Sequence, residues 1–325
     1  MTVPGILLAA LIISILLNFL GLQILKYFQL KQTVRECVPQ NHQAKTGTPI
    51  MGGLIIIAAL DILAVLFLPR LSGLPRLTNE VIILLTLFTL TGVIGFLDDW
   101  LIVVRGKNNG LKPRYKLLGQ LIIAALFCAY LLKNNFHLLV SPFLHILGMH
   151  QPVLYVLFSS FIVVGVSNAV NLTDGLDGLS AGVSIIVLLA LAFIAQYSFH
   201  NSQLMYLALL AALAILGFLF FNYNPAKMFM GDVGSLSLGT LLAGFALLLH
   251  AELYLALVGL VFVWETLSVI LQVGYFRLTK GGRLFKMSPF HHHLELCGWS
   301  ERKIVHSAWL ITAVLALVAI IFRIR

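Results

Sequence analysis

The stretch EVIILLTLFTLTGVIGFLDDW, residues 80–100, decides the fold class of this chain. It is a long, mostly apolar run that ends on Asp98 and Asp99. Since a helix needs roughly 20 mostly apolar residues to cross a bilayer, this stretch predicts a transmembrane helix with two acidic residues at one end. Comparable runs recur along the 325 residues, near 4–28, 52–68, 80–97, 117–132, 153–170, 179–197, 204–221, 236–251, 253–275 and 305–322. The sequence therefore predicts an all-α polytopic membrane protein with about ten transmembrane helices.

The composition supports this prediction and excludes a soluble domain. Hydrophobic residues make up 60% of the chain and charged residues 10%, and the mean hydropathy is +1.00. A soluble domain of this size needs far more charge. No long polar stretch interrupts the apolar runs, so we expect one membrane domain over residues 1–325. The net charge of +9 does not indicate nucleic-acid binding, because the basic residues lie in loops, where membrane topology explains them.

The basic residues also predict the orientation. Alternate loops contain 16 of the 21 lysines and arginines, namely those near 26–51, 98–116, 171–178, 222–235 and 276–304. Basic loops face the cytosol, so we expect both termini to be extracytoplasmic.

Five aspartates fall in the same set of loops, at or near the ends of apolar runs: Asp98, Asp99, Asp174, Asp177 and Asp232. Acidic residues do not set topology, and carboxylates at membrane helix ends are costly unless paired or bound to a metal. We therefore expect a shared active site at the cytosolic face. Carboxylate oxygens are ligands that Mg²⁺ prefers, together with substrate phosphates. Asp232 could also serve only as a helix cap.

Two further motifs indicate phosphate chemistry. Residues 288–295 read SPFHHHLE. Three consecutive histidines cannot all face one metal in regular structure, which disfavours a zinc site, but histidine can donate to phosphate or move a proton near neutral pH. Residues 45–53 read KTGTPIMGG, and glycines beside a lysine suit a phosphate group.

The combined motifs resemble the polyprenyl-phosphate hexosamine-1-phosphate transferase superfamily, and within it the phospho-N-acetylmuramoyl-pentapeptide transferase family. The resemblance covers essentially the whole chain. The matching stretches occur in family order: KTGTPIMGG (45–53), GFLDDW (95–100), NAVNLTDGLDGLSAG (168–182), FNYNPAKMFMGDVGS (221–235) and SPFHHHLELCGWSE (288–301).

The resemblance implies a reaction between two substrates. Phospho-N-acetylmuramoyl-pentapeptide would pass from UDP-MurNAc-pentapeptide to undecaprenyl phosphate, giving the first lipid intermediate of peptidoglycan synthesis and UMP. It further implies a requirement for Mg²⁺, a homodimer, contact with membrane lipid, and a place in the bacterial inner membrane with the active site facing the cytoplasm.

The resemblance also assigns roles to residues. The implied catalytic residues are Asp98, Asp99, Asp232 and His291, and the implied metal ligands are Asp232 and Asp99. The implied substrate-binding residues are Lys45, Asn171, Asp174, Asp177, Asn222, Phe229, Gln272 and His292, with Glu265 as a weaker candidate beside Gln272.

This sequence departs from the family at two positions. Ile50 replaces a common threonine, and Ile102 replaces a lysine that often follows the acidic pair. Four other basic residues could supply the positive charge of that lysine instead: Arg105, Lys107, Arg114 and Lys116.

Three other functions stay open at this point. A sister enzyme would transfer GlcNAc-1-phosphate to the same lipid, although the triple histidine favours the muramoyl reaction. An ion-coupled transporter would place its acids near the bilayer midplane, and a lipid-binding scaffold would not need Asp232. For a transferase, either an aspartate attacks the diphosphate or the lipid phosphate attacks directly. We favour direct attack, because a phosphate monoester with a second pKa of about 6 is mostly dianionic at neutral pH.

Overall fold

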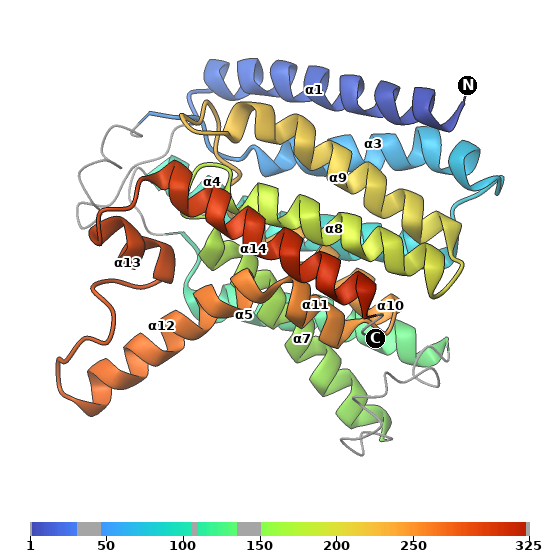
Figure 1. Cartoon of the computed structure of the whole chain (residues 1–325). Coiled ribbons are helices and arrows are strands. Elements are labelled where there is room, and N and C mark those ends of the chain that lie inside the picture. The colour runs from blue at the N-terminus through green and yellow to red at the C-terminus, as the bar shows by residue number, and fades with distance from the viewer. Residues whose placement is uncertain (1, 31–46, 106–109, 135–150, 323–325) are drawn as a thin grey trace.

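The computed structural model describes residues 2–30, 47–105, 110–134 and 151–322, and their secondary-structure elements are helices (Figure 1). Ten of these helices are long and apolar enough to cross a membrane, which confirms the prediction of an all-α polytopic membrane protein. The helices are α1 (Val3–Tyr27), α3 (Gly53–Ser72), α4 (Asn79–Arg105), α5 (Pro113–Lys133), α7 (Pro152–Thr173), α8 (Leu179–Tyr197), α9 (Ser202–Asn222), α10 (Gly231–Leu248), α11 (Glu252–Val258), α12 (Leu260–Leu278), α13 (Phe290–Leu296) and α14 (Glu301–Ile321).

Local sequence explains where several helices begin. α1, α5 and α7 each carry a proline in the first turn, where the missing N–H removes no helical hydrogen bond. The side chain of Asn201 accepts from Leu204 N at 3.0 Å before α9. Ser300 accepts from Lys303 N at 3.4 Å before α14. These caps satisfy N–H groups that a helix leaves free at its start.

Helix α10 forms the centre of the bundle and packs mainly against α4 and α7. Glycines allow this packing. A Cβ atom at Gly95 of α4 would overlap the backbone of Asp232, and one at Gly53 of α3 would overlap the backbone of Gly234. Small residues let membrane helices approach closely where lipid supplies no hydrophobic drive for association. The approach of α4 to α10 fixes the geometry of the site described below.

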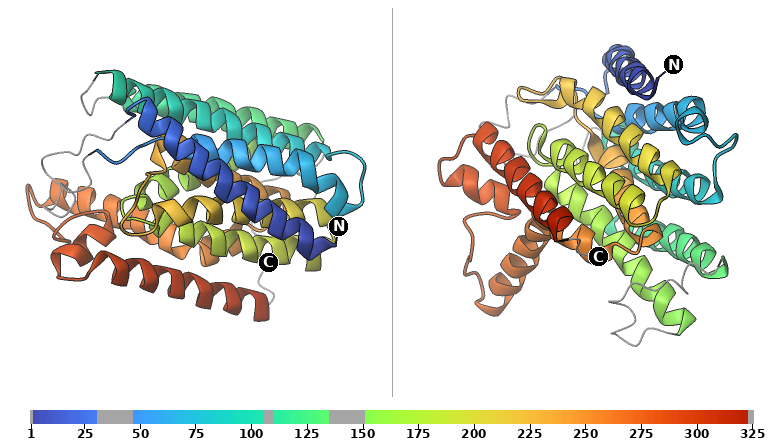
Figure 2. Two further views of the ribbon diagram at one scale, coloured as in Figure 1. Left: turned by 90° about the horizontal axis from the view of Figure 1, so that it is seen from above. Right: turned by 45° about the vertical axis from the view of Figure 1, so that its right-hand side comes forward.

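The apolar run 253–275, expected as a single span, is divided. α11 ends and α12 begins at Gly259, where a Cβ atom would lie 2.7 Å from the carbonyl oxygen of Leu255. A residue without a side chain permits this close approach. Beyond Gly259, α12 leaves the bundle at an angle (Figures 1 and 2). The short helix α13, which the apolar pattern did not predict, follows α12 and leads to α14.

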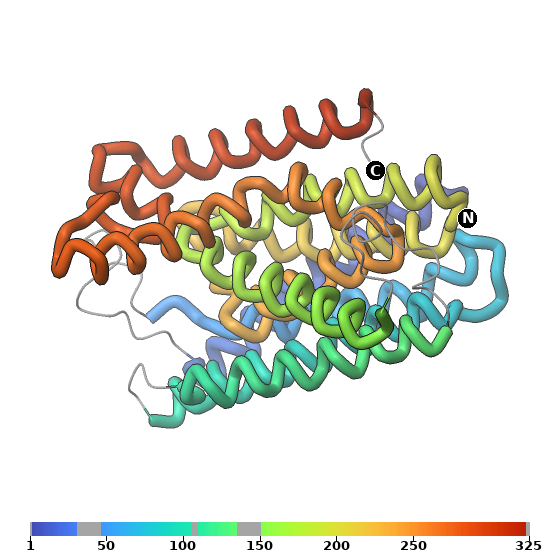
Figure 3. The backbone as a smooth tube through the Cα atoms, turned by 90° about the horizontal axis from the view of Figure 1, so that it is seen from below, coloured from blue at the N-terminus to red at the C-terminus, as the bar shows by residue number. Residues whose placement is uncertain are grey.

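The start of α1 and the end of α14 lie at the end of the bundle that faces away from α13 (Figure 3). An even number of crossing helices has this consequence. The carboxyl-terminal end of α4 and the amino-terminal end of α10 meet at the other end of the bundle, on the side of α13.

Candidate active site

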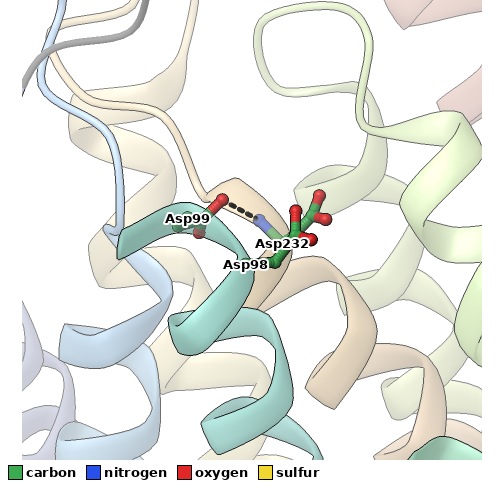
Figure 4. Close-up of side chains that lie close together, drawn as sticks. All are labelled: Asp98, Asp99 and Asp232. Carbon is green, nitrogen blue, oxygen red and sulfur yellow. Dashed lines mark hydrogen bonds between the residues drawn. The ribbon is translucent and has the colours of Figure 1, made fainter. Parts of the chain in front are cut away.

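Three aspartates from two helices form a cluster. Asp98 and Asp99 lie in α4, about two turns before its end, and Asp232 lies in the first turn of α10. Each of the three can present one carboxylate oxygen within 4.8 Å of the others. Figure 4 shows the carboxylates of Asp98 and Asp232 on the same side, while that of Asp99 lies against the start of α10. Three of the five aspartates that were predicted to share a site therefore lie together.

The carboxylate of Asp99 caps the amino terminus of α10. One of its oxygens accepts from Asp232 N at 3.2 Å and the other from Val233 N at 3.1 Å. Asp99 is 2% exposed, so water does not compete well for these donors. The first N–H groups of a helix need outside acceptors, and a side chain of the neighbouring helix α4 provides them here. Asp99 thus fixes the backbone that carries Asp232.

Polar partners orient the other two carboxylates. Asp98 accepts from Leu111 N at 2.8 Å. Asp232 accepts from the side-chain amide of Asn171 at 2.7 Å, and Lys116 Nζ contacts its other oxygen. The same Nζ lies 3.9 Å from Asp98. One lysine cannot balance three ionised carboxylates, and this donor set of hard oxygens could hold a divalent cation such as Mg²⁺.

Lys116 is one of the four basic residues considered for the charge that Ile102 does not supply. It lies in the first helical turns of α5 and contacts Asp232. The other departure, Ile50, is buried at 7% exposure, and its backbone N donates to Leu30 O at 2.9 Å. Its side chain packs in the apolar core rather than offering a polar contact.

Asp177 and Asn222 connect two loops beside the aspartate cluster. Asp177 accepts from Ala226 N at 3.0 Å. Asn222 accepts from Gly178 N and donates to Met228 O, each at 3.0 Å. Both residues are buried, at 3% exposure. These hydrogen bonds hold loop 174–178 against loop 223–230. Contact of Asp177 and Asn222 with substrate stays a prediction.

Glu301 at the start of α14 supports the same loops. Its carboxylate accepts from Asp177 N at 2.7 Å and from the Asn224 side chain at 2.9 Å. In the sequence, Glu301 stands out only as the last residue of the motif 288–301. Its position in the first turn of a helix after a Ser cap is a weak signal, because many such residues are solvated.

The three histidines of α13 point to different partners, as the sequence argument required. His291 Nδ1 lies 3.1 Å from Glu265 Oε2, and His292 Nδ1 lies 2.8 Å from Glu295 Oε2. His293 Nδ1 accepts from the backbone N of residue 286 at 3.1 Å. They form no common metal site. The pairing of His291 with Glu265 was not foreseen, although an acidic residue inside an apolar run is a signal of function.

Gln272 and Phe229 hold loops at the edge of the site. The side chain of Gln272 accepts from Leu284 N and Phe285 N and donates to Phe285 O, at 2.9 to 3.1 Å. The backbone of Phe229 bonds to Gly52 and Pro49, each at 2.8 Å, and its ring is partly buried. A role for either side chain in nucleotide binding stays a prediction.

The remaining predicted residues lie nearby or outside the described part of the chain. Asp174 ends α7, and its backbone N donates to Asn171 O at 3.2 Å. It therefore lies one turn from the amide that contacts Asp232. Lys45 falls outside the residues that the structure describes.

Comparisons with known proteins found similar sequences over nearly the whole chain. The sequence profile of glycosyl transferase family 4 matches residues 81–250, which include all three clustered aspartates. The chain is 42% identical over 323 residues to a phospho-N-acetylmuramoyl-pentapeptide-transferase of Staphylococcus carnosus, covering 96% of each chain. It is 43% identical over 321 residues to the proteins of that name from Staphylococcus aureus, covering 96% of this chain and 97% of the relative, and from Staphylococcus epidermidis, covering 95% and 97%.

Proposed function

Since the chain belongs to the phospho-N-acetylmuramoyl-pentapeptide transferase family, within glycosyl transferase family 4, its reaction is the transfer of phospho-N-acetylmuramoyl-pentapeptide, and we propose that UDP-MurNAc-pentapeptide is the donor and undecaprenyl phosphate the acceptor. The products are then the first lipid intermediate of peptidoglycan synthesis and UMP. The observation that carries the proposal is the cluster of Asp98, Asp99 and Asp232 at one end of a multi-pass helical bundle.

The reaction brings two anions together, so charge neutralisation is the main task of the site. Mg²⁺ bound by Asp232, with Asp98 or Asp99, would neutralise the diphosphate of the donor. Lys116 supplies a fixed positive charge at the same carboxylates. Asn171 orients Asp232 through the bond at 2.7 Å, and Asp99 holds the backbone under it.

The lipid phosphate attacks the donor directly in this proposal. Because the acceptor is mostly dianionic at neutral pH, removal of its proton accelerates the reaction little, and positioning contributes more. Asp98 lies beside Asp232, and in this proposal its carboxylate helps to orient the acceptor. A covalent phosphoglycosyl-enzyme together with UMP release in the absence of lipid acceptor would contradict direct attack.

The active site faces the cytoplasm of a bacterium in this proposal, in the inner membrane. Most basic residues lie in loops on one side, which the positive-inside rule assigns to the cytosol, and the nucleotide donor is a soluble molecule of that compartment. The lipid acceptor reaches the same end of the bundle from within the bilayer. We further propose that the protein acts as a homodimer, which the family resemblance supports.

The direct test is UMP release by the purified protein with undecaprenyl phosphate, with and without Mg²⁺. Separate reactions with UDP-MurNAc-pentapeptide and with UDP-GlcNAc distinguish the two transferases, and we expect turnover only with the first donor. Turnover only with UDP-GlcNAc, or substrate uptake into vesicles without UMP release, would contradict the proposal.

A further inference from the structure

His291 is held from one side by a carboxylate of another helix. The imidazole is fully buried, at 0% exposure, and Glu265 of α12 is 5% exposed. Glu265 Oε2 lies 3.1 Å from His291 Nδ1 and also accepts from the backbone N of His291 at 3.3 Å. One carboxylate oxygen therefore fixes both the ring and the start of α13.

The other ring nitrogen points to the loop that carries Asp174 and Asp177. His291 Nε2 has no hydrogen-bond partner among the described residues. Gly175 lies directly against it, since a Cβ atom at that position would overlap Nε2. A buried polar nitrogen without a partner is unfavourable, and such atoms in a native protein often mark a place where a ligand or a water binds.

The pairing decides which nitrogen is chemically available. An ionised carboxylate can only accept a hydrogen bond, so Nδ1 carries a proton whether the imidazole is neutral or charged. Nε2 is then the atom that donates to a phosphate oxygen or exchanges a proton. The residue that orients a histidine in this way controls its tautomer and its direction.

We propose that Glu265 is the positioning residue of His291, and that it holds Nε2 toward loop 174–178 to meet a phosphate oxygen of the nucleotide-sugar donor. This inference rests on the proposed function. It assigns Glu265 a role through His291 and not through direct contact with substrate. It also explains an acidic side chain within a mostly apolar helix, where an unpaired carboxylate is costly.

A double-mutant cycle tests the proposal. The purified wild type, Glu265→Gln, His291→Ala and the double variant are compared by kcat and KM for UMP release, with thermal unfolding as the check of folding. We expect Glu265→Gln to lower kcat at least about tenfold with little change in KM. In the His291→Ala background, the same substitution should change kcat by less than roughly twofold, because its partner is gone.

Independent, multiplicative losses in the cycle would overturn the proposal, as would a wild-type kcat in Glu265→Gln. If that variant does not fold, Glu265→Asp takes its place, and we expect it to retain part of the activity. A wild-type protein without transferase activity would instead refute the proposed function.

A second pair of variants tests the direction of Nε2. Gly175→Ala places a methyl group against Nε2, and we expect it to lower kcat at least about tenfold. Gly165→Ala in α7 is the matched control, since no atom lies within 4 Å of a Cβ there. Equal activity in the two variants would show that Nε2 does not face the substrate.

Discussion

The substitution Asp99→Asn distinguishes two roles that Asp99 can have: capping the start of α10 and binding a metal ion directly. The carboxylate accepts from Asp232 N at 3.2 Å and from Val233 N at 3.1 Å. Asparagine has one acceptor oxygen, and its amide nitrogen would face a backbone donor. One buried N–H of α10 then loses its partner, and the start of the helix that carries Asp232 must shift.

The magnitude follows from these two bonds. A buried donor without a partner costs about 1–3 kcal/mol, and a lost helix cap costs about 0.5–2 kcal/mol. We therefore expect Asp99→Asn to lower the free energy of unfolding by about 2 kcal/mol. If the same shift displaces Asp232 from its working position, kcat also falls, by about tenfold for each 1.4 kcal/mol of transition-state stabilisation that is lost.

The assay is thermal unfolding in detergent combined with UMP release over a series of Mg²⁺ concentrations. Asp61→Asn is the matched control, because Asp61 lies in α3 and accepts a hydrogen bond from the Thr89 hydroxyl at 3.2 Å. An unchanged unfolding temperature together with a large rise in the Mg²⁺ requirement would refute the capping role and favour direct metal binding by Asp99.

Three further outcomes follow from the contacts of the site. Lys116→Met should lower kcat about 10- to 100-fold, because it removes the cation at Asp232. Lys112→Met, at the exposed start of α5, is the control and should keep a kcat near that of the wild type. Equal effects of the two substitutions would contradict the role of Lys116. Asn222→Ala leaves Gly178 N and Met228 O without their side-chain partner. It should lower the free energy of unfolding, measured by thermal unfolding, by about 1–3 kcal/mol. An unchanged melting temperature would show that water replaces the side chain. Chelation of divalent cations should abolish UMP release and added Mg²⁺ should restore it; full activity in excess chelator would exclude a metal requirement.

Much of the fold could be predicted because the bilayer imposes one strong length requirement on apolar runs. Ten runs predicted ten crossing helices, and the described residues contain ten helices that are long and apolar enough to cross a membrane. The residue at which a helix ends was harder to predict than the presence of the helix. α4 continues from residue 97 to Arg105, because polar residues can extend a helix beyond the apolar core. The break at Gly259 was missed, since a single glycine also occurs within intact helices.

The gathering of Asp98, Asp99 and Asp232 could be predicted because their helix ends share one side of the bundle. Their individual partners could not. The cap formed by Asp99 depends on how closely α4 approaches α10. That distance depends on glycines at the contact between the helices, such as Gly95. The partner of His291 lies 26 residues away on another helix, and its choice depends on the angle at which α12 leaves the bundle.

Asp232→Ala tests the central claim most directly. The variant and the wild type are compared at saturating Mg²⁺ for release of UMP and for formation of the lipid product from UDP-MurNAc-pentapeptide. The account predicts a folded protein, shown by an unfolding temperature close to that of the wild type, in which both products fall below detection. Substantial formation of the lipid product by Asp232→Ala would contradict the assignment of this aspartate cluster as the site of transfer.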